Sequence, residues 1–235
     1  MQNGRPSHNT LDTQRIDRTI SRLLKRIDER FPDSGLGKVG TDFYEFNKHC
    51  AENIEWISRP IYWIRIVTYL FIGLAAIGLI YSITLLRFEV TPTFSNVAAV
   101  LEAVVNDVIL LGAGIFFLFT LENRVKRTRA IRSLNELRGF AHVVDMHQLT
   151  KDPQLIGQPY SKTDNSPKRT MTKFELQRYL DYCSELLSLI GKTAVLYAQQ
   201  LPDEVVLSSA NELEQLCSSL SQKIWQKLII LNGAE

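Results

Sequence analysis

The apolar residues of this chain are concentrated in two runs separated by a short polar segment. Residues 66–86 contain no charged side chain, and residues 97–121 are apolar except for polar side chains in their first half. A helix needs about 20 apolar residues to cross a hydrocarbon core of about 30 Å. The sequence therefore predicts transmembrane helices at 61–86 and 97–121, joined by a short external loop at 87–96.

Residues 11–60, before the first run, have the period of amphipathic helices, whereas residues 1–10 lack periodic apolar positions and predict a disordered tail. In the first helical pattern, apolar residues recur at steps of three or four: Ile16, Ile20, Leu23, Ile27 and Phe31. Basic residues lie between them. Two interpretations remain open: the helix packs on the cytoplasmic domain, which we prefer, or it lies on the lipid headgroups.

Three glycines, Gly35, Gly37 and Gly40, have the GxGxxG spacing of dinucleotide-binding loops. That fingerprint requires a preceding strand and a following βαβ unit, but a helical pattern precedes these glycines and a polar helical stretch follows them. We therefore expect a flexible turn and no nucleotide cofactor.

Residues 122–235 have the pattern of a cytoplasmic helical domain with a loop at about 151–172. The helical pattern of the second span continues to about Thr150. Two further apolar seams follow, and the short joint at Pro202 and Asp203 predicts that their helices form an antiparallel pair. With the 122–150 helix they form a three-helix bundle, to which the N-terminal helix adds a fourth. The predicted fold class is an all-α membrane protein, a two-span transmembrane helical hairpin with a cytoplasmic helical bundle.

Positive charge lies at the outer ends of the hairpin and is nearly absent from the 87–96 loop, which contains only Arg87. The positive-inside rule then predicts a multi-pass protein of the cell inner (plasma) membrane with cytoplasmic N and C termini. The residues expected to contact anionic lipid headgroups are Arg59, Arg65, Arg124, Lys126, Arg127 and Arg129. The formal net charge is only +2, so we expect no nucleic acid partner.

The three cysteines, Cys50, Cys183 and Cys217, are far apart and form no CxxC pair. Their number is odd, and Cys183 and Cys217 lie on apolar faces of predicted helices. This pattern favours reduced, buried thiols over a disulfide framework or a zinc site. We expect neither a metal ion nor a cofactor.

The densest polar cluster outside the spans consists of Arg138, His142, Asp145 and His147. The first three share one helix face and can bond to one another, whereas His147 points elsewhere. A structural network is the preferred interpretation. A functional polar site is the alternative.

Polar residues also occur inside the second predicted span: Glu102, Asn106 and Asp107. An acid at this depth needs a partner, and the antiparallel first span offers Tyr81 and Ser82. The alternatives are a packing contact of Asp107 within the hairpin and a water-filled ion path lined by several copies.

The absence of a specific catalytic motif, together with well-defined packing seams, favours a non-enzymatic, membrane-anchored helical scaffold or interaction module. It would assemble with itself or with a cytoplasmic protein partner. An oligomeric ion channel or transport subunit using Asp107 and Glu102 is the alternative. An enzyme with a site at Arg138, His142 and Asp145 is third.

Overall fold

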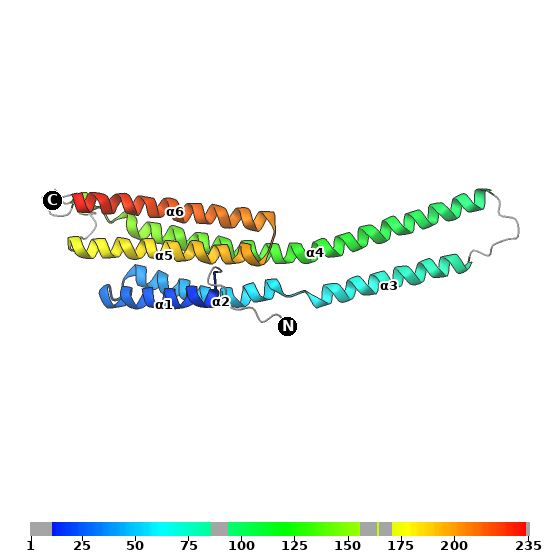
Figure 1. Cartoon of the computed structure of the whole chain (residues 1–235), viewed down its shortest axis with the longest axis horizontal. Coiled ribbons are helices and arrows are strands. Elements are labelled where there is room, and N and C mark those ends of the chain that lie inside the picture. The colour runs from blue at the N-terminus through cyan, green and yellow to red at the C-terminus, as the bar shows by residue number, and fades with distance from the viewer. Residues whose placement is uncertain (1–10, 86–93, 156–163, 165–170, 234–235) are drawn as a thin grey trace. The chain divides into compact units, whose positions relative to one another are not determined.

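The structure of the chain is a computed structural model that describes residues 11–85, 94–155, 164 and 171–233. Every regular element in these ranges is a helix (Figure 1), which confirms the all-helical prediction. The chain forms two compact units: the bundle unit, Met1–Ser58 with Arg129–Glu235, and the hairpin unit, Arg59–Thr128. The predicted tail and most of both predicted loops lie outside the described residues.

Six α-helices and one 3₁₀ turn make up the described fold. They are α1 (Thr13–Arg30), α2 (Gly35–Ser58), α3 (Tyr62–Leu85), α4 (Phe94–Leu149), η1 (Pro153–Leu155), α5 (Lys173–Gln200) and α6 (Glu204–Gly233). Helix α4 is continuous over 56 residues, so the helical pattern of the second apolar run does continue beyond residue 121, as predicted.

Helix α5 occupies the centre of the bundle unit, since it packs against α1, α2 and α6. Its side chains are buried on several faces. A capping box starts the helix, in which Thr172 accepts from the Glu175 N–H and Glu175 accepts from the Thr172 N–H. Helix α6 lies beside α5 after a short connection (Figure 1), as the predicted antiparallel pair requires.

The apolar face of α1 is buried in this bundle. Its four core residues, Ile16, Ile20, Leu23 and Ile27, have exposed fractions of 4% or less. Helix α1 contacts α2 and α5. The structure thus has the first of the two predicted arrangements, because the apolar side chains of an interfacial helix would remain free for lipid.

Helix α2 belongs to the core as well. From its sequence we expected a mainly polar helical stretch. Its buried positions recur at steps of three or four: Leu36, Val39, Phe43, Asn47, Cys50, Ile54 and Ile57. Phe43 also makes an edge contact with Phe140 of α4, at 5.7 Å between ring centroids. The core therefore gathers five helices, α1, α2, α4, α5 and α6, instead of three or four.

The flexible turn expected at the three glycines is wrong, because α2 already begins at Gly35. The chain reverses just before it, where Asp33 has a positive φ of 57°. The glycines instead permit close packing. A Cβ on Gly40 would lie 2.5 Å from Leu24 Cδ2 of α1, and one on Gly35 would collide with the His147 ring of α4.

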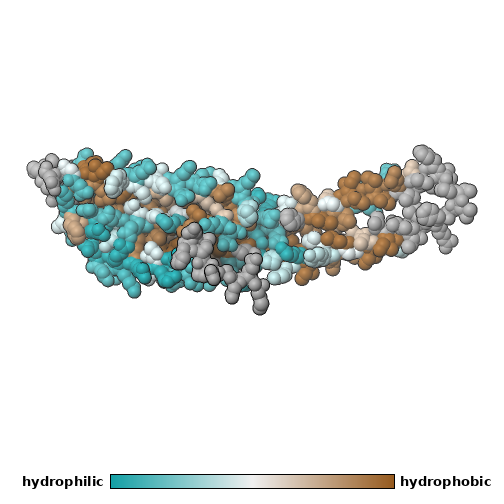
Figure 2. All heavy atoms as spheres, viewed as in Figure 1, coloured by the Kyte–Doolittle hydropathy of each residue, from teal (hydrophilic) through white to brown (hydrophobic). Residues whose placement is uncertain are grey.

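The hairpin unit contains the two helices that are long and apolar enough to cross a membrane. In the most apolar 18-residue windows, within Gly35–Gly78 and Val104–Leu149, only 6% and 0% of residues are buried. Figure 2 shows apolar side chains at the surface of α3 and of the N-terminal part of α4. Core helices of soluble proteins have the opposite property, since they bury their apolar side chains.

Candidate functional site

The predicted cluster on α4 is divided among different neighbours. Arg138 Nη2 donates to Glu212 Oε2 of α6 at 3.0 Å. Asp145 Oδ1 accepts from Gln148 Nε2 at 2.5 Å. His142 is exposed and makes no hydrogen bond or ion pair to any described residue. These side chains do not converge, and the described residues contain no group of His, Cys, Asp or Glu that could hold a metal ion.

His147, the fourth residue of that cluster, is half-buried beside Gly35, where α2 begins. Burial lowers the pKa of the imidazole below its ordinary value, and the nearby Lys151 ammonium lowers it further. The folded protein therefore favours the neutral ring. The role of His147 is to pack one end of α4 against the start of α2.

A buried polar layer crosses the bundle between α2 and α5, and sequence reasoning did not find it. The Thr193 hydroxyl lies 3.2 Å from Asn47 Oδ1, and Tyr197 donates its hydroxyl hydrogen to Cys50 Sγ at 3.1 Å. Asn47 Nδ2 has no partner among the described residues. The only sequence signal was the position of Asn47 and Cys50 on an otherwise apolar seam.

All three thiols are buried, as the cysteine pattern predicted. Burial raises the pKa of Cys50 and of Cys183 to about 12, and that of Cys217 to about 11. Thiolates are the reactive form of cysteine, so these groups are poor nucleophiles at neutral pH. Their place is in the packed core.

The base of the hairpin unit is held by one carboxylate, Glu122. Glu122 Oε1 accepts from the Ile61 N–H at 3.3 Å and from Lys126 Nζ at 3.0 Å, and Arg65 Nε lies 3.6 Å from Oε2. Burial raises the pKa of Glu122, but the bonds from Lys126 and Ile61 outweigh it, so the net shift is downward. Glu122 and Lys126 are each 9% exposed, which makes this a buried charge network joining α3 to α4.

The other basic residues expected at the headgroups are exposed just outside the predicted spans or at their borders: Arg59, Arg65, Arg124, Arg127 and Arg129. Arg129 also lies over the Trp56 ring, 4.0 Å from its centroid. Lys126 differs from them, because its ammonium group points to Glu122.

The polar residues of the second apolar run are exposed on α4, and no described residue forms a hydrogen bond or ion pair with Glu102, Asn106 or Asp107. Tyr81 is exposed on α3, and the side chain of Ser82 is not among those described. A glycine of α4 also contacts α3 inside the hairpin unit. A Cβ on Gly114 would lie 2.5 Å from Phe71 Cε1, so the absence of a side chain there makes room for the Phe71 ring of α3 against α4.

A basic surface runs along the outside of α1 and was not singled out from the sequence. We call it the basic α1 face, and its members are Arg15, Arg18, Arg22 and Lys25. All four side chains are exposed and form no ion pair with a described residue. Because they recur at steps of three or four, they form one stripe along the helix.

Beside this face, α1 and α5 border a cleft of about 510 Å³. Its walls carry three guanidinium groups and two aromatic rings, from Arg26, Arg30, Arg178, Phe174 and Tyr182, together with Glu29. Arg26 forms a two-pronged ion pair with Glu185. Arg30 lies over Phe174, 5.0 Å from the ring centroid, and its charge helps to lower the pKa of Glu175 without forming an ion pair with a described residue.

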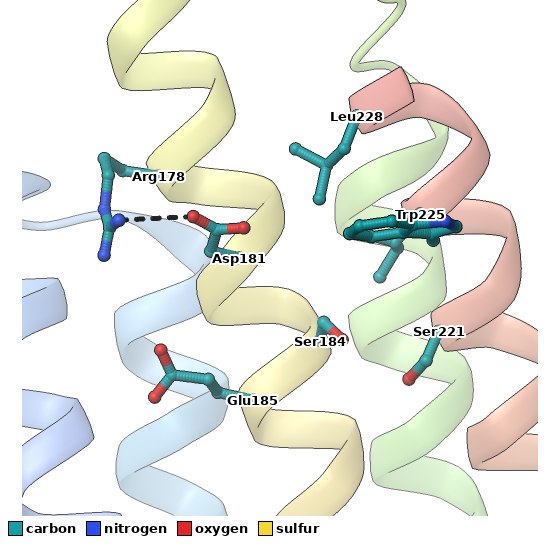
Figure 3. Close-up of a pocket in the computed structure, with 8 residues that line it drawn as sticks. Arg178, Asp181, Ser184, Glu185, Ser221, Trp225 and Leu228 are labelled. Carbon is teal, nitrogen blue, oxygen red and sulfur yellow. Dashed lines mark ion pairs between the residues drawn. The ribbon is translucent and has the colours of Figure 1, made fainter. Parts of the chain in front are cut away.

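A second cleft, of about 270 Å³, lies between α5 and α6. Figure 3 shows Arg178 and Asp181 on α5, 3.3 Å apart at their closest charged atoms, and Trp225 and Leu228 on α6. Arg178 borders both clefts, and Trp225 is 63% exposed at the rim of the second one. The first cleft offers guanidinium groups and aromatic rings, and the second combines the Arg178–Asp181 ion pair with the apolar side chains of α6.

Comparison of the chain with models of known protein families, with curated proteins and with solved structures finds no match. The class that the fold defines is an all-helical protein with two exposed apolar helices and a packed helical bundle.

Proposed function

We propose that the chain is a membrane-anchored helical interaction module that is not an enzyme. Helix α3 and the N-terminal part of α4 cross the inner (plasma) membrane as a hairpin, and the bundle unit binds a protein partner in the cytoplasm. The observation that carries this proposal is the exposure of both apolar helices: in the most apolar 18 residues of each, only 6% and 0% of residues are buried. In water such surfaces would be strongly unfavourable, at roughly 25 cal/mol per Å² of apolar area.

The charges at the base of the hairpin support an orientation with both ends of the chain in the cytoplasm. The exposed arginines near the base include Arg59, Arg65, Arg124 and Arg127. They suit the cytoplasmic surface, where loops carry an excess of Lys and Arg and anionic lipids attract them. The buried Glu122 joins the two helices at the same level of the hairpin unit.

The basic α1 face and the adjoining cleft favour an acidic protein segment as the partner of the bundle unit. Five cations in this region form no ion pair with a described residue: Arg15, Arg18, Arg22, Lys25 and Arg30. Between residues 15 and 25 the face extends for about 15 Å along the helix, at 1.5 Å per residue. Acidic residues at similar spacing on a partner helix would match it.

The same region is too narrow for double-stranded nucleic acid. Asp17 lies toward α2, since it acts on Lys48 of that helix, and Asp181 and Glu185 border the other side on α5. A nucleic acid site needs a wide basic surface, because affinity comes from many phosphate contacts. One acidic segment of a protein fits the width of a single helix face.

A photo-crosslinking amino acid at Thr19, which is exposed on α1, tests this proposal in native membranes. We expect it to capture a partner through a peptide rich in Asp and Glu. The charge reversal Arg15→Glu, Arg18→Glu and Arg22→Glu should reduce capture by about tenfold or more. The matched control makes the same change of charge elsewhere on the bundle unit, with Arg132→Glu, Lys192→Glu and Lys223→Glu, and should leave capture unchanged.

Crosslinks to lipid alone would identify the face as a membrane contact and would contradict the protein partner. Capture that does not respond to the charge of α1 would contradict it equally.

The channel alternative has its own test. It requires Asp107 and Glu102 of several copies to line an ion path. Ion flux through reconstituted vesicles that is lost in Asp107→Asn would favour it, and the interaction module predicts no flux in either protein.

A further inference from the structure

We infer that a second copy of this chain packs against α4 inside the membrane, with Asn106 of each copy hydrogen-bonded to the other. This inference rests on the proposed membrane anchoring and names one partner of the module. The contact surface is the outer α4 seam, which we define as Glu102, Asn106, Ile109, Ala113, Phe116 and Thr120.

The outer α4 seam lies on the side of the helix that faces away from α3. Gly114 contacts Phe71 of α3, and Glu122 binds Ile61 and Arg65, so these positions mark the α3 side of α4. At about 100° per residue, the seam residues project on the opposite side. All six are exposed, which leaves the seam free for a contact outside the hairpin.

The spacing of the seam suits a second helix along the whole apolar run. Its members follow one another at steps of 4, 3, 4, 3 and 4 residues. This is the 3.5-residue period of left-handed coiled coils, and it keeps one stripe of a helix facing a partner that crosses at about 20°. Transmembrane helices pair in the same geometry.

The side chain of Asn106 indicates that the partner is a second copy of the chain. Its amide has two donor hydrogens and one acceptor oxygen, no described residue pairs with it, and its side of the helix is turned from α3. In hydrocarbon an unpaired amide is unfavourable. A second copy inserts in the same orientation, so its own Asn106 lies at the same depth, and two such amides complement each other as donor and acceptor.

A different protein would need a polar group of its own at this depth. A buried Asn at a core position also fixes the register of paired helices, which is its best-attested use. Ala113, one heptad further along, leaves room for close approach of the backbones. Asp107 lies beside the seam and outside it, so a change at Asp107 affects the alternative ion path without removing a residue of the proposed contact.

Disulfide crosslinking of the full chain in native membranes tests this inference. Cysteine introduced at Ala113 should give disulfide-linked dimers on mild oxidation, and cysteine at Leu110, off the seam, should give few. The three native cysteines need not be replaced for this experiment, because their thiols are buried and protonated. Adding Asn106→Leu should lower the dimer yield at position 113 by about tenfold, in line with the energy of one hydrogen bond between membrane helices.

Two variants make the result specific. Asn106→Gln keeps the amide and should retain most of the dimer, and Asp107→Leu removes a charge outside the seam and should leave the dimer intact. Equal crosslinking at 110 and 113, or a dimer that survives Asn106→Leu, would overturn the inference. Extraction with alkaline carbonate tests membrane anchoring separately. If the anchoring proposal fails, carbonate releases every variant from the membrane. A chain that stays in the membrane as a monomer would contradict only the proposed dimer.

Discussion

A single carboxylate, Glu122, determines how the two apolar helices are held together at their base. It accepts from the Ile61 N–H and pairs with Lys126 and Arg65. Buried charges are tolerated only when they are paired and hydrogen-bonded. The network therefore stabilises the hairpin only while Glu122 keeps all of these partners.

Replacing Glu122 tests this network. Glu122→Ala should speed hydrogen–deuterium exchange at the Ile61 amide, because its acceptor is lost. Glu122→Gln keeps an acceptor and should speed exchange less, although it leaves Lys126 without its counter-charge. Exchange at the buried core of α5 serves as an internal control. Identical exchange at Ile61 in the wild type and in Glu122→Ala would show that the bond is not made.

His147 gives the bundle a dependence on pH. Its pKa in the folded protein lies below the ordinary 6.5, so the unfolded chain binds the proton more readily. The stabilising effect is complete above pH 6.5 and is lost as pH falls through the lower folded-state pKa. The Tm of the detergent-solubilised chain should therefore decrease as the pH falls below 6.5, and His147→Gln should flatten this part of the curve. An equally steep decrease in His147→Gln would assign the effect to other groups.

At the level of residues, the sequence indicated the positions of buried thiols but not their partners. Cys50 and Asn47 lie on one seam of α2, yet the hydroxyls that meet them, on Tyr197 and Thr193, are almost 150 residues away along the chain. Periodicity reports which face of a helix is buried and not what lies opposite. The same limit explains Arg138, which shares a helix face with Asp145 but pairs with Glu212.

Among the elements, α5 carries most of the packing of the bundle. Leu187 is fully buried on this central helix. Leu187→Ala should lower the free energy of unfolding by about 2–5 kcal/mol, because it leaves a cavity among residues that relax only in part. The exposed Gln199 provides the control on the same helix, and Gln199→Ala should change stability by no more than about 0.5 kcal/mol. Denaturant unfolding in detergent measures both, and equal effects would contradict the central position of α5.

The buried faces of helices with strong apolar periodicity were predictable from the sequence. The buried face of α2, where polar residues and glycines interrupt the apolar positions, was not. The seams of α1, α5 and α6 are clear in the sequence, and the structure buries them. The burial of α2 was not predicted because Asn47 interrupts its apolar seam and because three glycines near its start suggested a turn. Glycine favours turns when considered alone, but here it lets helices approach closely, which depends on Leu24 and His147 of other elements.

At the scale of the molecule, the sequence separates an apolar hairpin from a helical bundle because apolar residues cluster in one and recur periodically in the other. The structure forms two compact units, Arg59–Thr128 and the remainder of the chain. The binding surfaces were less predictable, since the cleft between α1 and α5 joins residues from both ends of the chain. The proposed function combines the two units: the hairpin anchors, and the bundle binds.

Membrane anchoring with both ends in the cytoplasm is the claim on which the other proposals depend. The most direct measurement combines alkaline carbonate extraction with protease access to tags at the two ends of the chain. The account predicts that the chain stays with the membrane, and that both tags are cut from the cytoplasmic side and protected from the other. Release of the chain without detergent, or tags in opposite compartments, would contradict it.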